Sequence, residues 1–446
     1  MLIVTLLMTC CAADASAPLA NAVELRVVGP WTVEVAQGVL RGCDSTLEIP
    51  GPVRLDIEPP ETVRVRDEVH LKLPVFNENT AAWAKGVKLD ALITEECSAT
   101  DKLYPDSLAV KNGRGDATPF QRGVDYELDP MWGTFGRIEG GAIEAEQTVF
   151  VDYDYSPDRL DTIAIDEQGS VSLVKGTSGI GDMLPPAVAS DQIPLANVWV
   201  LGQLRELTGE HLFPIDFSAP DLGGGAPVAE ERLPKTLAKL RAGEEVTIVA
   251  WGDSVTCGGG VTGVKEDWYQ NQFLALLQER FPNARIRMLN AGWGGVSSAH
   301  YMKEPPGGTY DYVRDVLDPK PDLVTIEFVN DAYYNEEQTV EHYGKIVEQL
   351  EGNGSEVVLI TPHLVRPDWL QSDTFKVKED PRPYVKGLRR FAQENGVALA
   401  DASEDWCNLW RHGIPYMTLL ANSINHPEAR GHAIFAKRLI GLFPDK

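Results

Sequence analysis

Apolar and polar residues alternate with a short period along the first half of the chain. Residues 63–66, 69–73 and 149–153 each place an apolar side chain at every second position. This period of two is typical of β-strands that bury one face. Clusters of Gly, Pro, Asn and Asp separate these stretches, and amphipathic helical patterns are scarce. The pattern predicts a β-rich N-terminal domain over residues 23–220, either an antiparallel sandwich or two smaller β modules.

The second half has a different pattern, in which apolar runs alternate with amphipathic helical segments. The apolar runs predict five buried strands, at residues 246–251, 286–289, 323–328, 357–360 and 397–400. The helical segments are residues 267–281, 336–350, 383–395 and 427–442. Such alternation builds a parallel sheet covered by helices on both faces. We therefore expect an α/β domain over residues 230–446, joined to the first by a flexible Gly-rich linker at residues 221–229.

Short polar motifs follow the predicted strands at their carboxyl ends, where parallel α/β sheets bind their ligands. Ser254 follows the first strand in a Gly-Asp-Ser tripeptide, and a Gly-rich loop at residues 290–295 follows the second. Asn330 ends the third strand, and His426 precedes the last helix. Each motif alone is weak, because glycine turns and single histidines are common. Their order and their shared place at strand ends make the combination specific.

This combination resembles the GDSL/SGNH hydrolase family, and the resemblance covers about residue 244 to the C-terminus. The resemblance implies a flavodoxin-like three-layer domain that acts as a serine carboxylesterase. Ser254 matches the family's nucleophile and His426 matches its base. The N–H groups of Ser254 and Gly295 and the side-chain amide of Asn330 match its oxyanion hole.

The chemistry of ester hydrolysis requires these residue types. A serine hydroxyl is a weak nucleophile until a neighbouring imidazole takes its proton, so Ser254 needs His426. Attack on an ester carbonyl builds negative charge on oxygen, which preorganised N–H donors stabilise. Gly295 suits this task because a bare backbone can approach the carbonyl closely.

Two positions depart from the family's pattern. Phe328 stands where the family has a glycine two residues before its asparagine, and either narrows the acyl pocket or fills core. Ser423 stands where the family has an aspartate three residues before its histidine. The site is therefore expected to work as a Ser–His dyad or as an atypical triad. Candidate orienting groups are the carboxylates of Asp401, Glu404 and Asp405, or the neutral acceptors Ser423, Asn422 and a backbone carbonyl.

Several residues near the motifs are candidates for substrate binding. Trp251 and Trp293 flank the nucleophile and the Gly-rich loop, where their rings could stack on a sugar; the alternative is core packing. His363 and Arg366 follow the fourth strand and could bind a polar or anionic substrate, with a plain loop position as the alternative. Phe328 is a further candidate for the pocket wall.

Composition limits the partners and the location. The formal net charge of −26 disfavours nucleic acid, because a phosphate backbone would be repelled. Residues 1–17 are typical of an export signal, which predicts a secreted or periplasmic protein; a lipid anchor at Cys10 or Cys11 is the less favoured alternative. Beyond them no segment is suited to span a membrane. Cys43 and Cys97 either form a disulfide or remain buried thiols, and no motif indicates a metal or another cofactor.

The sequence thus predicts an esterase that removes small acyl groups, acetyl foremost, from a carbohydrate or polysaccharide. The appended β domain, the nearby tryptophans and the lack of a long apolar lid favour a sugar over a lipid. Two alternatives stay open. One is a lipase, thioesterase or aryl esterase of the same fold, and the other is a glycan-binding surface protein whose hydrolase domain has lost its activity.

Overall fold

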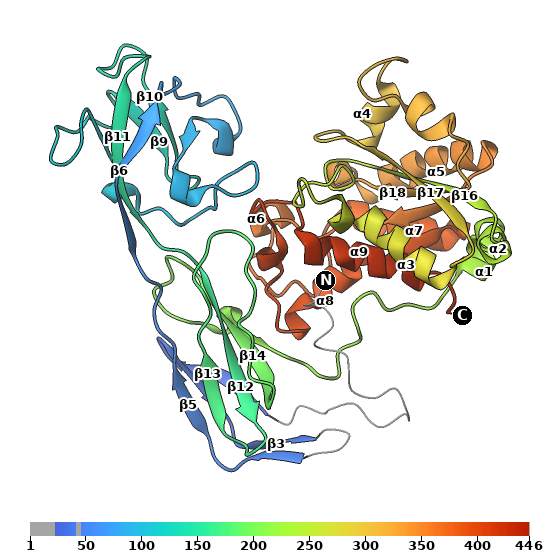
Figure 1. Cartoon of the computed structure of the whole chain (residues 1–446), viewed down its shortest axis with the longest axis horizontal. Helices are drawn as coiled ribbons and strands as arrows, with labels where there is room; N and C mark the ends of the chain where they lie inside the picture. The colour runs from blue at the N-terminus through green and yellow to red at the C-terminus, as the bar shows by residue number, and fades with distance from the viewer. Residues whose placement is uncertain (1–22, 42–45, 446) are drawn as a thin grey trace. The chain divides into compact units, whose positions relative to one another are not determined.

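The computed structural model describes residues 23–41 and 46–445, so the predicted export signal and Cys43 lie outside the described residues. The chain forms two compact units (Figure 1). The C-terminal unit contains residues 219–409 and 424–445, and the N-terminal unit contains residues 23–218 and 410–423. Each unit is described by itself below.

The N-terminal unit is built from antiparallel strands around two hydrophobic cores. The first core lies between a three-stranded and a four-stranded sheet, with side chains such as Val33, Ile163 and Val198 completely buried. The sheets are β1 (Leu25–Gly29), β2 (Thr32–Val35) and β5 (Val53–Asp56), then β13 (Val171–Val174), β12 (Arg159–Asp166), β14 (Gln192–Val200) and β15 (Leu212–Pro214). The hairpin of β3 (Gly38–Arg41) and β4 (Thr46–Ile49) packs its apolar residues into the same core. This part is the sandwich that alternation predicts.

The second core belongs to a module inserted between β5 and β12. It buries Phe135, Val149 and Tyr153 among others. One sheet contains β6 (Val63–Leu71), β11 (Thr148–Tyr155) and β8 (Ala109–Lys111), and the other contains β7 (Val87–Lys88), β10 (Thr134–Arg137) and β9 (Tyr126–Asp129). The β-rich half therefore contains two modules, one of them interrupted in sequence by the other.

The C-terminal unit is a three-layer α/β domain around a five-stranded parallel sheet. The strand order is β17-β16-β18-β19-β20, the flavodoxin-like order in which the chain reverses direction after its second strand. The strands are β16 (Glu245–Gly252), β17 (Arg285–Gly292), β18 (Leu323–Glu327), β19 (Glu356–Ile360) and β20 (Ala398–Ala400). Each of the five predicted apolar runs forms one of these strands. β16, β18 and β19 are buried along almost their whole length, as apolar strands covered on both faces are, whereas the edge strand β17 is partly exposed.

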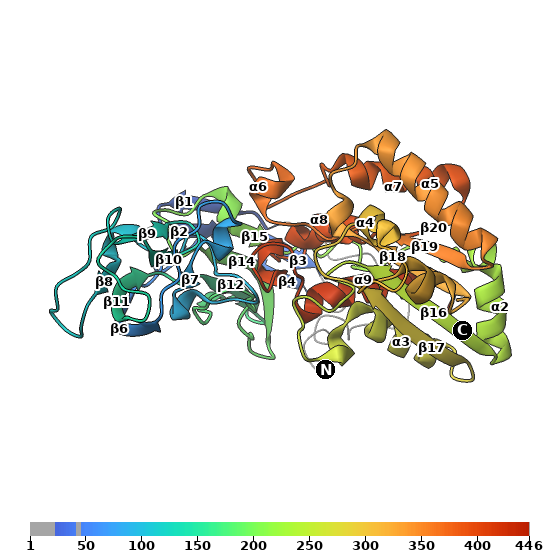
Figure 2. The same ribbon diagram turned by 90° about the horizontal axis from the view of Figure 1, so that it is seen from above.

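Helices cover both faces of this sheet (Figures 1 and 2). On one face, α5 (Glu336–Gly352) and α7 (Pro383–Asn395) bury Tyr343, Ile346 and Leu388 in the main core. On the other face, α3 (Tyr269–Arg280) packs on α9 (Ala429–Gly441), with the rings of Tyr269 and Phe435 5.6 Å apart. Shorter helices complete the unit: α1 (Ala229–Arg232), α2 (Pro234–Ala242), α4 (Ser298–Lys303), α6 (Pro367–Leu370) and α8 (Ala402–Asn408).

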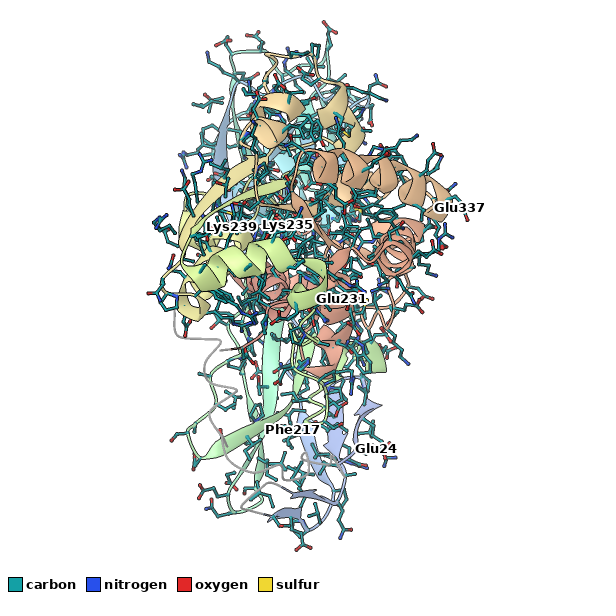
Figure 3. The ribbon with its side chains drawn as sticks, turned by 90° about the vertical axis from the view of Figure 1, so that its right-hand side faces the viewer. Glu24, Phe217, Glu231, Lys235, Lys239 and Glu337 are labelled. Atoms are coloured by element: carbon teal, nitrogen blue, oxygen red, sulfur yellow. The ribbon has the colours of Figure 1, made fainter. Side chains whose placement is uncertain are left out.

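The Gly-rich segment 221–229 is packed against the C-terminal unit, so the prediction of a flexible linker is wrong. The N–H of Gly223 donates to Asp405 Oδ1 at 3.0 Å, and a Cβ on Gly223 would lie 2.4 Å from the Lys437 Cβ. Helix α2 follows, with Lys235 and Lys239 labelled along it in Figure 3. Glu356 accepts the backbone N–H of Lys235 at 2.9 Å and Lys239 pairs with Asp322 at 2.6 Å, which fastens α2 to the amino ends of the strands.

One segment of the second half folds with the N-terminal unit. Residues 410–423 belong to it, although the pattern assigned all of residues 230–446 to the hydrolase domain. Arg411 pairs with Asp216 at 2.7 Å, and Asn197 Nδ2 donates to the Gly413 carbonyl at 2.7 Å. Within the described residues, the chain therefore passes between the units three times. Among the described residues, no helix is long and apolar enough to cross a membrane.

Candidate active site

The nucleophile candidate Ser254 lies on a tight turn at the carboxyl end of β16. Gly252 ends the strand, and a Cβ at this position would lie 2.0 Å from Thr256 Oγ1 and 2.3 Å from the Glu327 carbonyl oxygen. A side chain would collide with both, so only glycine allows β16, β18 and the turn to approach this closely. Close packing therefore explains why the first residue of the Gly-Asp-Ser motif is a glycine.

Asp253 fastens the Ser254 turn to the loop that follows β18. Its side chain is completely buried, and its carboxylate accepts the N–H groups of Val255 at 3.2 Å and of Asn330 at 2.9 Å. Buried polar groups of this kind are costly unless they are hydrogen-bonded, so the two loops are held in one arrangement. Asp253 therefore sets the position of Asn330 relative to Ser254.

His426 meets Ser254 across a separation of 172 residues. The imidazole is only 5% exposed, and its Nε2 lies 3.0 Å from Ser254 Oγ. This is hydrogen-bond distance, within the reach that a general base needs. A neutral imidazole at this position accepts the hydroxyl proton of the serine.

The triple-glycine turn, residues 258–260, lets the His426 loop come this close. A Cβ on Gly260 would lie 2.0 Å from the Pro427 carbonyl oxygen, and one on Gly259 would lie 3.0 Å from the His426 ring. His432 supports the turn from below, because its Nε2 lies 3.0 Å from the Gly259 carbonyl oxygen. Sequence pattern does not reveal this contact, since a histidine inside an amphipathic helix has no distinctive spacing.

The loop after β17 lies beside the nucleophile. A Cβ on Gly294 would lie 3.9 Å from that of Ser254, and the neighbouring Gly295 has a φ of +76°, in the left-handed region that favours glycine. The Asn330 side-chain amide donates to the Val296 carbonyl at 3.3 Å, which joins this loop to the one after β18. The oxyanion roles of Gly295 and Asn330 remain predictions.

Three carboxyl groups are buried beneath the loops that hold Ser254 and Asn330. Glu327 is completely buried, and neither carboxyl oxygen has a hydrogen-bond partner among the described residues. Burial, reinforced by the neighbouring Asp253, raises the pKa of Glu327 well above its ordinary value, and burial likewise raises the pKa of Asp253. Burial also raises the pKa of Asp331 to about 6. Burial therefore makes all three carboxyl groups harder to ionise than exposed ones.

The three carboxylate candidates for a third member of the triad form ion pairs with arginines. Both Asp401 oxygens accept hydrogen bonds from Arg389, at 2.8 and 3.0 Å, and Thr361 also donates to it at 2.8 Å. Glu404 and Asp405 both pair with Arg438. The structure therefore engages these three carboxylates with arginines. The neutral candidates Asn422 and Ser423 lie in the segment that folds with the N-terminal unit.

Several residues named as candidates for substrate binding are buried, which favours the alternative of core packing for Trp251 and Phe328. Trp251 and Phe328 are completely buried in the main core, with ring centroids 5.1 Å apart. They continue the alternation of their strands on the face that packs against α5 and α7, so no substrate reaches them. His363 is completely buried as well, and Arg366 is almost buried and pairs with Asp368.

Two exposed aromatic residues follow the loops beside Ser254. The Trp293 side chain is exposed, since the residue is 39% exposed, and its backbone N–H donates to the Gly252 carbonyl at 3.1 Å. Tyr333 is 60% exposed and comes three residues after Asn330. The sequence analysis named Trp293 and missed Tyr333, although its place just past the third motif was a usable signal.

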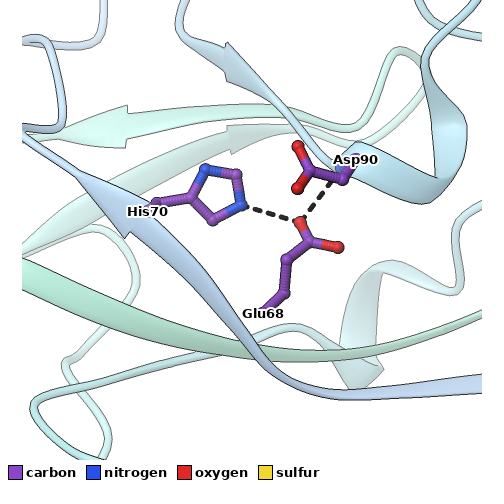
Figure 4. A group of neighbouring side chains, drawn as sticks. All are labelled: Glu68, His70 and Asp90. Carbon is purple, nitrogen blue, oxygen red and sulfur yellow. Dashed lines mark hydrogen bonds and ion pairs between the residues drawn. The ribbon is translucent and has the colours of Figure 1, made fainter.

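A possible set of metal ligands lies in the N-terminal unit, away from these motifs in sequence. Glu68, His70 and Asp90 each offer one ligand atom, all within 4.8 Å of one another (Figure 4). Glu68 Oε1 accepts from His70 Nε2 at 2.7 Å and from the Asp90 N–H at 3.0 Å, and Tyr153 donates to Oε2 at 2.6 Å. Hydrogen bonds therefore account for this arrangement without an ion.

Comparison with known families identifies the C-terminal half. Residues 250–434 match the model of the GDSL-like Lipase/Acylhydrolase family. The match includes all four motif positions and confirms the resemblance read from them. No curated protein sequence matches the chain.

Some solved structures are similar to part of this chain at low sequence identity. A two-domain esterase (CEX) active on acetylated mannans is 20% identical, with a TM-score of 0.39; the match covers 47% of this chain and 52% of that esterase, about half its length. Axe2, an acetylxylan esterase from Geobacillus stearothermophilus, is 20% identical with a TM-score of 0.35, covering 44% of this chain and 92% of Axe2. LAE5, an α/β hydrolase enzyme from the metagenome of Lake Arreo, Spain, is 22% identical with a TM-score of 0.34, and the match covers 45% of this chain and 97% of LAE5.

Proposed function

We propose that this GDSL-like domain is a serine esterase that removes short acyl groups, acetyl foremost, from a carbohydrate. The supporting observation is the 3.0 Å separation between Ser254 Oγ and His426 Nε2, on loops that also bring Asn330 and the Gly-rich segment to the serine. The predicted export signal would bring such an enzyme to polysaccharides outside the cytoplasm.

The proposed mechanism proceeds through an acyl-enzyme. His426 takes the hydroxyl proton as Ser254 Oγ attacks the ester carbonyl carbon, and the carbonyl oxygen of the ester becomes an oxyanion. The N–H groups of Ser254 and Gly295 and the amide of Asn330 stabilise that charge. His426 then gives its proton to the departing sugar oxygen, which leaves as a hydroxyl group. A water molecule activated by the same imidazole hydrolyses the acyl-enzyme and releases the carboxylic acid from Ser254. Ser254 and His426 act as a dyad or as part of an atypical triad.

A sugar substrate is supported by the kind of surface that follows the catalytic loops. Trp293 and Tyr333 expose aromatic rings, which stack well on the apolar faces of sugars. Among the described residues of the C-terminal unit, the exposed large hydrophobic side chains are two tryptophans, one tyrosine and two valines: Trp293, Trp369, Tyr333, Val264 and Val313. A long acyl chain needs a continuous aliphatic surface, which this set does not supply.

Substrate preference is tested by comparing acetylated polysaccharides with p-nitrophenyl esters of increasing chain length. We expect acetate release from the polysaccharide and a steep fall in kcat/KM beyond short acyl chains. A preference for long chains would instead identify a lipase on the same scaffold.

The nucleophile is tested by covalent labelling with a fluorophosphonate. We expect labelling of the wild type, loss of labelling and hydrolysis in Ser254→Ala, and full labelling in the control Ser372→Ala, a loop serine of the same unit. A folded wild-type protein that is neither labelled nor active would support a domain that has lost its catalysis.

A further inference from the structure

His363 is a buried histidine with a single tautomer. It follows β19 and is completely buried, with its ring 5.4 Å from that of Trp406 and 6.0 Å from that of Phe435. Its Nε2 lies 2.6 Å from the carbonyl oxygen of Asn425. A carbonyl oxygen only accepts, so Nε2 carries the proton and donates it.

The group that accepts this hydrogen bond precedes the base in sequence. Asn425 is followed directly by His426, whose own Nε2 lies 3.0 Å from Ser254 Oγ. The N–H of Arg366 donates to the Ile424 carbonyl at 2.9 Å. The two backbone carbonyls before His426 are therefore both held by the segment of residues 363–366.

His363 is itself held firmly from behind. Arg382 Nη2 donates to the His363 carbonyl at 2.8 Å, and Arg382 Nε donates to Asp380 Oδ1 at 2.9 Å. Ser403 Oγ donates to the other Asp380 oxygen at 2.7 Å. All of these side chains are buried. Burial and the nearby Arg382 lower the pKa of His363 well below its ordinary value, so the ring remains a neutral donor.

We propose that His363 is a positioning residue for catalysis: its hydrogen bond to the Asn425 carbonyl sets the backbone of His426 at the distance that Ser254 requires. This inference rests on the proposed function of Ser254 and His426. A misplacement of about 1 Å at a catalytic group can cost on the order of 10²-fold in rate. A ring of similar size that lacks the donor would leave a buried carbonyl without its partner and free the loop to shift.

The test compares two substitutions in the full-length chain. His363→Phe keeps a ring but removes the donor, and His363→Gln keeps a side-chain N–H. With p-nitrophenyl acetate we expect His363→Phe to lower kcat about 10- to 100-fold while KM changes less than about twofold. We expect His363→Gln to keep kcat within about fivefold of the wild type. Ser355→Ala is the matched control, because it removes a buried donor to the Pro321 carbonyl at the opposite end of β19.

A second readout does not depend on a substrate. The titration of the His426 ring, followed by NMR and assigned with His426→Gln, should differ in His363→Phe from that of the wild type. It should stay at its wild-type value in His363→Gln and Ser355→Ala. Circular dichroism and Tm establish that each variant is folded.

The outcomes separate this inference from the proposed function. If Ser254→Ala abolishes hydrolysis but folded His363→Phe keeps wild-type kcat and an unchanged His426 titration, the positioning role is overturned. Equal losses in His363→Phe and His363→Gln would also overturn it, because the retained donor would then have no effect. If Ser254→Ala is as active as the wild type, the proposed function fails, and the NMR titration still decides whether His363 positions His426.

Discussion

At the scale of single residues, Glu327 makes the stability of the C-terminal unit depend on pH. Burial holds the pKa of this unpartnered carboxyl well above its unfolded value, so the folded chain binds more protons than the unfolded chain. The stabilising contribution is complete below the unfolded pKa and is lost as the pH rises through the folded pKa. We expect Glu327→Gln to match the wild type at pH 5 within about 1 kcal/mol, and to exceed its free energy of unfolding by more than about 1 kcal/mol at pH 8.

Urea denaturation at pH 5, 6.5 and 8 measures this effect. Glu337, labelled on α5 in Figure 3, is the matched control because its side chain is 77% exposed. Glu337→Gln should parallel the wild type at every pH. Parallel curves for Glu327→Gln and the wild type would show that Glu327 is ionised in the folded protein.

The residues that the sequence identified are those whose chemistry and place along the strands are both distinctive. Ser254 and Asn330 combine a reactive or polar side chain with a place just after a strand, His426 combines one with a place just before the last helix, and the structure brings the three loops together. Trp251 could not be assigned, because a tryptophan beside a motif suits a core and a binding surface equally. His363 was placed at the surface, since no pattern in the sequence reveals that its ring donates to the backbone beside the base.

At the scale of elements, the strands were predictable because a strand buried on both faces must be apolar. The runs at residues 246–251 and 323–328 correspond to β16 and β18 almost residue for residue. The short helices α2 and α8 were missed, because so few turns provide too few apolar repeats for a helical period to be recognised. Three consecutive glycines at residues 258–260 are typical of a turn, but the contact of this turn with Pro427 depends on loops that only the folded sheet brings together.

This turn yields a prediction at the same scale. In Gly260→Ala the new Cβ would lie 2.0 Å from the Pro427 carbonyl oxygen, so the loop that holds His426 must move away from Ser254. We expect kcat for p-nitrophenyl acetate to fall on the order of 10- to 100-fold. Gly263→Ala is the control, since its φ of +86° is nearly that of Gly260, +87°, and open space surrounds it. An equal loss in both variants would attribute the effect to backbone strain instead of the contact with the His426 loop.

At the scale of the whole molecule, the division of the chain is less simple than its pattern. The pattern of apolar and polar residues changes once, near residue 220, which predicts two domains joined by one connection. The structure returns residues 410–423 to the N-terminal unit, through contacts such as Asn197 with Gly413. Pairing over more than 200 residues leaves no periodic signal, so hydrophobic patterning could not have revealed this exchange.

The returned segment makes the two units depend on each other for folding. Tyr416, Leu419 and Leu420 are buried, and the segment ends three residues before His426. A chain that begins at residue 219 would leave the carbonyls of Gly413 and Thr418 without the donors of Asn197 and Met183. We expect this truncated chain to aggregate or bind a hydrophobic dye, and to hydrolyse p-nitrophenyl acetate at least about tenfold more slowly, because its His426 loop starts from an unfolded segment. A truncated chain that is monomeric by size-exclusion chromatography and retains full-length kcat would show that residues 410–423 fold without the N-terminal unit.

In the full-length chain, Asn197→Ala should lower the free energy of unfolding by about 1–3 kcal/mol, the cost of an unsatisfied buried carbonyl, as measured by urea denaturation.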